Sequence, residues 1–146
     1  MLEEYISDAD LKKARENYGT TENPNETQQF EFALNLIRSK HRAEIEEGLY
    51  LFQNVFARTK DENIKRDTLY YMAIGQTKLS NYEQALKFLQ SILNVQPTNE
   101  QVRDLYVEVN KKMKRDGLIG LGIVGSAAAV GLVGIIGLGA ALLSKK

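Results

Sequence analysis

The 146-residue chain has 19 basic and 19 acidic side chains and no cysteine. The lack of cysteine excludes disulfides, thiolate metal sites and thiol catalysis. Two of the bases, Lys145 and Lys146, follow a long uncharged run, which leaves 17 bases against 19 acids in residues 1–116. This slightly acidic part lacks the basic footprint that nucleic-acid binding requires.

The first 116 residues have the pattern of a helical domain. Residues 1–7 form an acidic N-terminal arm, which we expect to be neither a secretory signal nor a transit peptide. No later segment alternates with a period of two, so strands are not expected. The pattern predicts an all-α domain over residues 8–115. Its helices are expected near residues 8–18, 26–39, 42–57, 61–79, 82–94 and 99–115.

The predicted helix starts depend on residues whose side chains cap free backbone N–H groups. The first helix begins after Ser7 or Asp8, and the second begins after Asn25 or Thr27. Three later starts carry the S/T-x-x-E/Q capping box, in which the first and fourth residues satisfy each other's backbone N–H groups. These boxes are Thr59–Glu62, Ser80–Glu83 and Thr98–Gln101.

Two of the later helices have apolar faces at helical spacing, which predicts that they are buried against the core. The expected core positions are Ala85, Leu86, Leu89, Ile92 and Leu93 in one helix, and Val102, Leu105, Tyr106, Val109 and Met113 in the other.

A weak internal repeat relates the helices from the second to the fifth. Ala73, Tyr82, Ala85 and Pro97 have the spacing of a tetratricopeptide repeat, in which small residues let two antiparallel helices approach closely. Residues 63–100 therefore form one repeat, and residues 27–62 form a degenerate one. Within the pair, Gly48, Phe52 and Val55 correspond to Ala85, Leu89 and Ile92. The first and sixth helices would cap this short stack.

The C-terminal run, residues 117–143, contains no charged residue. As a helix it would be roughly 40 Å long, more than the ~30 Å of a bilayer's hydrocarbon core. We therefore predict a transmembrane tail anchor, followed by a short basic exoplasmic tail at residues 144–146. The larger basic cluster before the run indicates a cytosolic N-terminal domain. The sequon Asn25-Glu-Thr27 is accordingly interpreted as a helix cap and not as a glycosylation site.

Several stretches, taken in order, resemble the mitochondrial fission protein 1 family of tail-anchored adaptors. They are Phe30-Glu-Phe-Ala33 with Arg38-Ser39-Lys40, Tyr70-Tyr71-Met-Ala73-Ile-Gly75 with Lys78-Leu79, Tyr82-Glu83-Gln-Ala85-Leu86-Lys87, and Asp116-Gly117-Leu118-Ile119-Gly120. The resemblance implies a six-helix bundle with two tetratricopeptide-like repeats plus one C-terminal transmembrane helix. It also implies residence on the mitochondrial outer membrane, and on peroxisomes. Such proteins recruit a dynamin-related GTPase, directly or through soluble adaptors, for mitochondrial and peroxisomal fission.

In tetratricopeptide proteins the first helix of each repeat faces a concave groove, and this resemblance gives the partner-binding positions. They are Phe30, Leu34, Ile37 and Arg38 in the first repeat and Tyr70, Ile74, Thr77 and Lys78 in the second. We expect Tyr70 and Thr77 to be more accessible than Leu34 and Ile74. An apolar groove with a basic rim suits a short amphipathic helix. The terminal pair, Lys145 and Lys146, is typical of mitochondrial and peroxisomal targeting.

No catalytic, cofactor-binding or metal-binding residue is predicted, so we expect a binding protein and not an enzyme. The single histidine, His41, is expected at an exposed helix–helix turn, and one histidine without cysteine does not make a zinc site. Two other functions remain open. The chain could be a receptor for precursor proteins or chaperones on the same membrane, or a structural protein whose anchor or domain forms a homo-oligomer.

Overall fold

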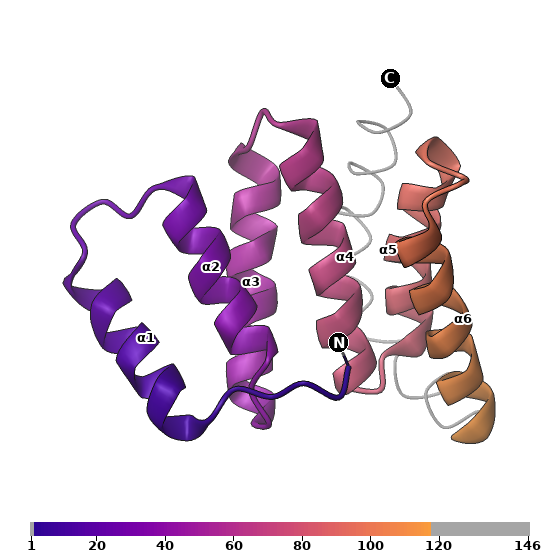
Figure 1. The fold of residues 1–146 in the computed structure, drawn as a ribbon, viewed down its shortest axis with the longest axis horizontal. Coiled ribbons are helices and arrows are strands. Elements are labelled where there is room, and N and C mark those ends of the chain that lie inside the picture. Colours follow the sequence, from indigo (N-terminus) through magenta and orange to yellow (C-terminus); the bar gives the residue numbers. More distant parts are fainter. Residues whose placement is uncertain (1, 118–146) are drawn as a thin grey trace. The chain divides into compact units, whose positions relative to one another are not determined.

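The computed structural model describes residues 2–117, which form six α-helices (Figure 1). These are α1 (Asp8–Thr20), α2 (Glu26–Ile37), α3 (Arg42–Arg58), α4 (Glu62–Lys78), α5 (Tyr82–Val95) and α6 (Glu100–Arg115). Each predicted helix is present, and every boundary lies within about two residues of its expected position. The all-α prediction is confirmed for this part of the chain.

The predicted membrane anchor, residues 117–143, lies outside the described residues except for Gly117, as does the tail at 144–146. Within residues 2–117, none of the helices combines the length and the apolar character that crossing a bilayer would require.

The first two helices begin where the sequence predicts. The Ser7 hydroxyl accepts a hydrogen bond from the Asp10 backbone N–H at 3.1 Å. At the start of α2, the Asn25 side chain accepts from the Gln28 backbone N–H, and the Gln28 side chain accepts from the Asn25 backbone N–H, both at 2.8 Å. This reciprocal pair is a complete capping box and fixes the entry into α2.

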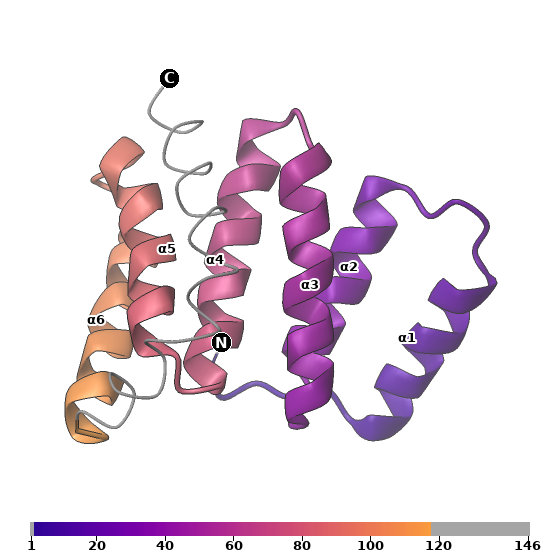
Figure 2. The same ribbon diagram turned by 180° about the vertical axis from the view of Figure 1, so that it is seen from behind.

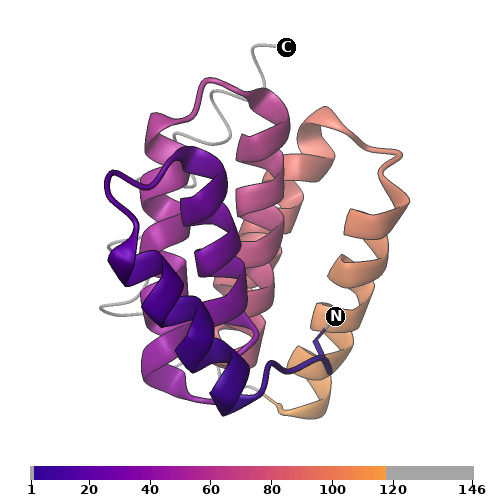
Figure 3. The ribbon, with the colours of Figure 1, turned by 60° about the vertical axis from the view of Figure 1, so that its left-hand side comes forward.

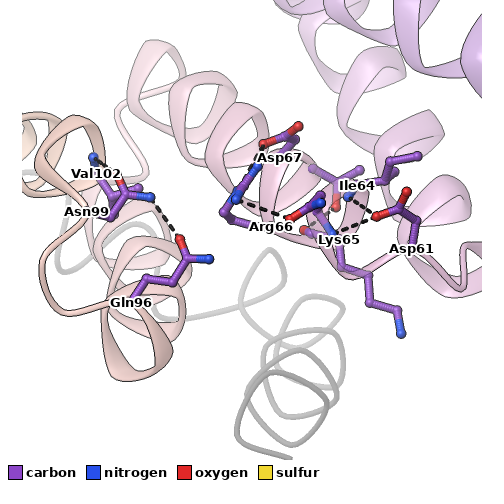
Figure 4. A network of polar contacts seen from close by, with 10 residues as sticks. Asp61, Ile64, Lys65, Arg66, Asp67, Gln96, Asn99 and Val102 are labelled. Atoms are coloured by element: carbon purple, nitrogen blue, oxygen red, sulfur yellow. Dashed lines mark hydrogen bonds and ion pairs between the residues drawn. The ribbon is translucent and has the colours of Figure 1, made fainter. Parts of the chain in front are cut away.

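The capping box predicted at Thr59 is wrong, because Thr59 ends α3 instead of starting α4. Its hydroxyl accepts from the Asp61 backbone N–H at 3.2 Å. The Asp61 carboxylate then caps α4, accepting from the backbone N–H groups of Asn63 at 2.8 Å and Ile64 at 3.4 Å (Figure 4). An ionised carboxylate at this position also interacts favourably with the positive end of the helix dipole.

The other two predicted boxes are also wrong, because in each case the N-cap is the residue after the predicted serine or threonine and no reciprocal box is formed. Asn81 precedes α5 without a side-chain cap, and Ser80 has a left-handed backbone, with φ of +64°. Asn99 caps α6 by accepting from the Val102 backbone N–H at 3.1 Å (Figure 4). Asparagine is as strong a helix cap as serine or threonine, so at α6 the S/T pattern selects Thr98, the residue before the observed cap.

The chain divides into two units, residues 1–75 and residues 76–146. In the first unit, α2 and α3 lie so close that Gly48 of α3 directly faces the α2 backbone. A Cβ placed on Gly48 would be 2.9 Å from the Ala33 carbonyl oxygen and 3.1 Å from the Ile37 backbone nitrogen. The small residue expected from the repeat is therefore required by this helix–helix contact.

The N-terminal helix α1 lies against α2 (Figure 3). Leu11 is its only fully buried residue, and it packs in a cluster that includes Phe32 of α2. The Tyr18 ring stacks on the same Phe32 ring at 4.4 Å between centroids. Arg15 adds a bidentate pair to Glu47 of α3, with N–O distances of 2.8 and 3.0 Å. Helix α1 thus caps the first repeat mainly through one leucine and one aromatic stack.

In the second unit, α5 and α6 pack side by side (Figure 2). The buried apolar residues of these helices are Tyr82, Ala85, Phe88, Leu89, Ile92, Val102, Leu105 and Val109. Of the ten predicted core positions, Leu86, Leu93, Tyr106 and Met113 are instead partly exposed. The positions equated by the repeat agree in burial, since Phe52, Val55, Leu89 and Ile92 are all at most 1% exposed.

Candidate partner-binding groove

Six of the eight predicted groove residues lie on the α2 and α4 segments of the first unit, where an aromatic cluster joins three helices. The ring of Phe30, on α2, meets the ring of Phe52, on α3, edge to face at 5.1 Å. The same Phe30 ring meets Tyr71, on α4, at 5.8 Å, and Phe52 stacks on Tyr71 at 6.0 Å. These are the offset and edge-to-face geometries that aromatic pairs prefer.

Tyr70 adds a fourth ring to the cluster. Its ring lies edge-on to Tyr71, with centroids 5.4 Å apart. Burial raises the pKa of the Tyr71 hydroxyl, and the nearby negative charge of Asp67 raises it further. Tyr71 therefore stays neutral at physiological pH, while half-buried Tyr70 presents an amphipathic side chain held by its neighbour.

Burial separates the predicted groove residues into two sets. Ile37 and Ile74 are at most 1% exposed, and Thr77 is 5% exposed, so these three belong to the core. The remaining five are partly exposed, namely Phe30, Leu34, Arg38, Tyr70 and Lys78. The expected order is thus wrong for one pair, because Leu34 is more accessible than Thr77. A small hydroxyl side chain is more easily covered by its neighbours than a leucine at the edge of a helix face.

The basic side chains predicted for the rim differ in their surroundings. Arg38 is the C-cap residue of α2, and its Nε atom is buried without a hydrogen-bond partner among the described residues. Its backbone carbonyl accepts from the Ile6 N–H at 3.0 Å, which places the N-terminal arm beside it. Lys40 contacts the same arm, with its ammonium 5.4 Å from the centre of the Tyr5 ring. The arm therefore lies at the C-terminal end of α2.

Lys78 lies in the second unit, in the last turn of α4, and is half-buried. A cation at a helix C-terminus interacts favourably with the negative end of the helix dipole. Lys78 therefore has a structural role within α4 in addition to any role toward a partner.

Sequence reasoning missed Phe52 and Tyr71 as supports of this surface. The repeat predicts only a core position for Phe52, and the sequence gives Tyr71 no individual role. The sequence feature that indicates Tyr71 is the pair of adjacent aromatic residues, Tyr70 and Tyr71, in one groove helix, with Phe30 in the other. Adjacent helix residues point in different directions, so one of two neighbouring tyrosines must turn toward the core.

No cluster of three or more histidine or carboxylate side chains within residues 2–117 could hold a metal ion. His41 is exposed, as expected, and its Nε2 lies 3.1 Å from an Asp8 carboxylate oxygen. This contact ties the start of α1 to the start of α3.

Comparison with known proteins identifies the family. Residues 66–118 match the family model of the Fis1 C-terminal tetratricopeptide repeat. The mouse mitochondrial fission 1 protein is 36% identical over 143 residues, covering 94% of this chain and 93% of the relative. The corresponding protein of Candida albicans is 34% identical, covering 78% of this chain and 72% of the relative. The chain belongs to the mitochondrial fission 1 protein family.

Solved structures of the family share the fold. The crystal structure of Saccharomyces cerevisiae Fis1 superposes with a TM-score of 0.69 at 23% identity, covering 79% of this chain and 89% of that chain. A crystal structure of yeast Fis1 in complex with an Mdv1 fragment superposes with a TM-score of 0.70, also at 23% identity, covering 79% and 91%. The predicted six-helix, tetratricopeptide-like architecture of a fission 1 protein is confirmed for the described residues.

Proposed function

We propose that this protein is an adaptor on the mitochondrial outer membrane that recruits a dynamin-related GTPase, directly or through soluble adaptors, for mitochondrial and peroxisomal fission. Family membership supports the role in mitochondrial fission. The yeast relative has been crystallised with a fragment of Mdv1 containing an N-terminal extension and a coiled coil, which supports a protein partner for this chain as well. The lipid bilayer, contacted through residues 117–143, is the second proposed partner.

The observation that carries the proposal is the partly exposed aromatic surface of the first unit. Phe30 and Tyr70 each have one side held by Tyr71 and are not completely buried. Pre-ordered aromatic side chains lose little conformational entropy on binding and are enriched among residues that dominate interfaces. Half-buried Leu34 adds apolar area on the same helix as Phe30. Such a surface fits the apolar face of an amphipathic helix.

The test uses the full chain in liposomes with a dynamin-related GTPase and its soluble adaptor as separate ligands. Tyr70→Ala should weaken binding by about 30-fold, corresponding to roughly 2 kcal/mol for an aromatic anchor. Tyr50→Ala is the matched control, because Tyr50 is 63% exposed on α3 and is not a groove residue. It should leave binding unchanged.

Leu34→Ala is the second groove variant. Thr77 is left unchanged, because it is buried and its substitution would report on stability instead of contact. Circular dichroism must show that each variant is folded. If the folded double variant Tyr70→Ala, Leu34→Ala recruits both ligands fully, this surface is not the recruiting one. Lys78→Glu should act chiefly on the association rate and its salt dependence, because rim charges steer encounter.

A further inference from the structure

The C-terminal end of α6 is a defined corner. The Asp116 backbone N–H donates to the Lys112 carbonyl at 2.9 Å, and the Gly117 N–H donates to the Lys114 carbonyl at 3.2 Å. Gly117 has a φ of +73°, in the left-handed region that ends helices and that other residues rarely adopt. A Cβ on Gly117 would meet nothing within 4 Å, so backbone conformation alone selects glycine here. Helix α6 therefore stops at this point, and the chain turns.

A tyrosine from another helix holds this corner. Tyr82, the first residue of α5, is 5% exposed, and its hydroxyl donates a hydrogen bond to the Asp116 carboxylate. The two residues are 34 positions apart, so the bond joins the start of one helix to the end of the next. The other carboxylate oxygen of Asp116 lies 3.4 Å from the Arg115 Nε. Both oxygens of Asp116 thus have donors.

The protonation behaviour of the pair agrees with this geometry. The hydrogen bond from Tyr82 is the main cause that lowers the pKa of Asp116. Burial, followed by the bond to Asp116, raises the pKa of Tyr82. A neutral hydroxyl donating to an ionised carboxylate is a charge-assisted bond, stronger than one between neutral groups.

We propose that Tyr82 and Asp116 form a latch that fixes the backbone at residues 116–117. Because the apolar run begins at Gly117, the latch sets the orientation of α5 and α6 relative to the membrane. Tyr82 is then a positioning residue of the adaptor. The inference rests on the proposed membrane anchoring of residues 117–143, because a fixed corner matters to the adaptor only if the membrane begins there. Helix ends fray readily, and without the latch the last turn of α6 would move with its basic side chains.

The hydroxyl, and not the ring, distinguishes a latch from ordinary packing. A phenylalanine at position 82 would fill the same space in the core and could not donate to Asp116. Asp116 is only the C-cap of α6 and takes no part in the apolar core. Tyr82→Phe and Asp116→Asn therefore test the bond from its two ends. Tyr106→Phe on α6 is the control, because Tyr106 is a partly buried tyrosine of the same unit whose hydroxyl makes no hydrogen bond among the described residues.

The experiment measures orientation in the full chain reconstituted in lipid nanodiscs. The chain has no native cysteine, so Thr98→Cys, in the exposed loop between α5 and α6, can carry a single fluorescent donor. Energy transfer to headgroup-labelled lipid then reports the distribution of heights of this loop above the bilayer. A narrow distribution is expected, and Tyr82→Phe and Asp116→Asn should each broaden it. The double variant should be no broader than Tyr82→Phe alone, because Asp116→Asn only weakens a bond that Tyr82→Phe already removes.

Amide hydrogen exchange separates failure of the latch from failure of the anchor. Exchange at the Asp116 and Gly117 amides should be about tenfold faster in Tyr82→Phe, because that variant loses one hydrogen bond to a charged group at a solvated site. Exchange should be unchanged in Tyr106→Phe. Unchanged exchange in Tyr82→Phe, or additive effects of the two variants, would refute the latch. Faster exchange without broadening would refute the positioning role alone. A chain that does not enter nanodiscs would overturn the anchoring and the positioning role, whereas exchange would still measure the bond.

Discussion

The close contact of α2 with α3 predicts that Gly48→Ala destabilises the domain although alanine is the better helix former. The new Cβ would lie 2.9 Å from both the Ala33 carbonyl oxygen and the Leu36 Cβ. Ordinary contacts begin near 3.4 Å, so the two helices must separate by roughly half an ångström. Overpacking costs about 1–3 kcal/mol, and replacing a mid-helix glycine returns about 1 kcal/mol. The net loss is up to about 2 kcal/mol, or a Tm lower by up to roughly 10 °C for a domain of this size.

Gly75→Ala is the matched control for this prediction. Its Cβ would meet the Ile37 Cδ1 at 2.7 Å and the Leu49 Cδ2 at 2.9 Å, which are the ends of flexible side chains. These can rotate away, so the gain in helix propensity offsets most of the cost and the Tm should change by only a few degrees. Thermal unfolding followed by circular dichroism at 222 nm measures both variants. A Tm for Gly48→Ala equal to or above that of Gly75→Ala would refute the argument from backbone contact.

Three further predictions concern stability, pH and targeting. Ala73→Arg should lower the free energy of unfolding by roughly 3 kcal/mol or more, because Ala73 is fully buried and a guanidinium there would be too large and would lose its hydration. A normal Tm in thermal unfolding would contradict this prediction. The pKa of Asp116 is lowered, so its contribution to the free energy of unfolding is present above about pH 4 and is lost as the pH falls through the folded-state pKa. In unfolding measured over a range of pH, the stability of Tyr82→Phe should therefore fall less on acidification than that of the wild type. Replacing Lys145 and Lys146 together with several glycines of the apolar run by leucine should divert the protein to the endoplasmic reticulum, as followed by fluorescence microscopy, and unchanged mitochondrial localisation would disprove the targeting hypothesis.

Much of the helical architecture can be predicted from the sequence because helix periodicity and capping are local signals. The helix ends at Ser7 and Asn25 follow from side chains that bond backbone groups three residues away. The errors arose where several capping residues are adjacent. Near Asp61 and Asn99, threonine precedes a better-placed acid or amide, and only the backbone angles decide which of them is the cap.

The candidate site was predicted less completely, because a repeat register gives the helix face and not the depth of each side chain. The repeat register predicts Ile37 on the same face of α2 as Leu34, and Ile74 and Thr77 on one face of α4, but these three side chains are buried. Their burial depends on residues distant in sequence, which a periodic pattern does not contain. The ring contacts that hold Phe30 could not be predicted either, because they require the relative rotation of three helices.

The exposed cap of α2 offers an internal indicator of orientation for the proposed membrane anchoring. Asn25 is solvent-exposed and begins the acceptor sequence Asn25-Glu-Thr27. Its Oδ1 serves the capping box, which leaves the Nδ2 amide, the atom that receives a glycan, directed away from the backbone N–H of Gln28. The enzymes that glycosylate this acceptor lie in the lumen of the endoplasmic reticulum. Only a chain inserted there with its N-terminal domain in the lumen would present this asparagine to them. A glycosidase-sensitive shift in gel mobility would therefore report that orientation, for example in the variant diverted to the endoplasmic reticulum, without any engineered tag.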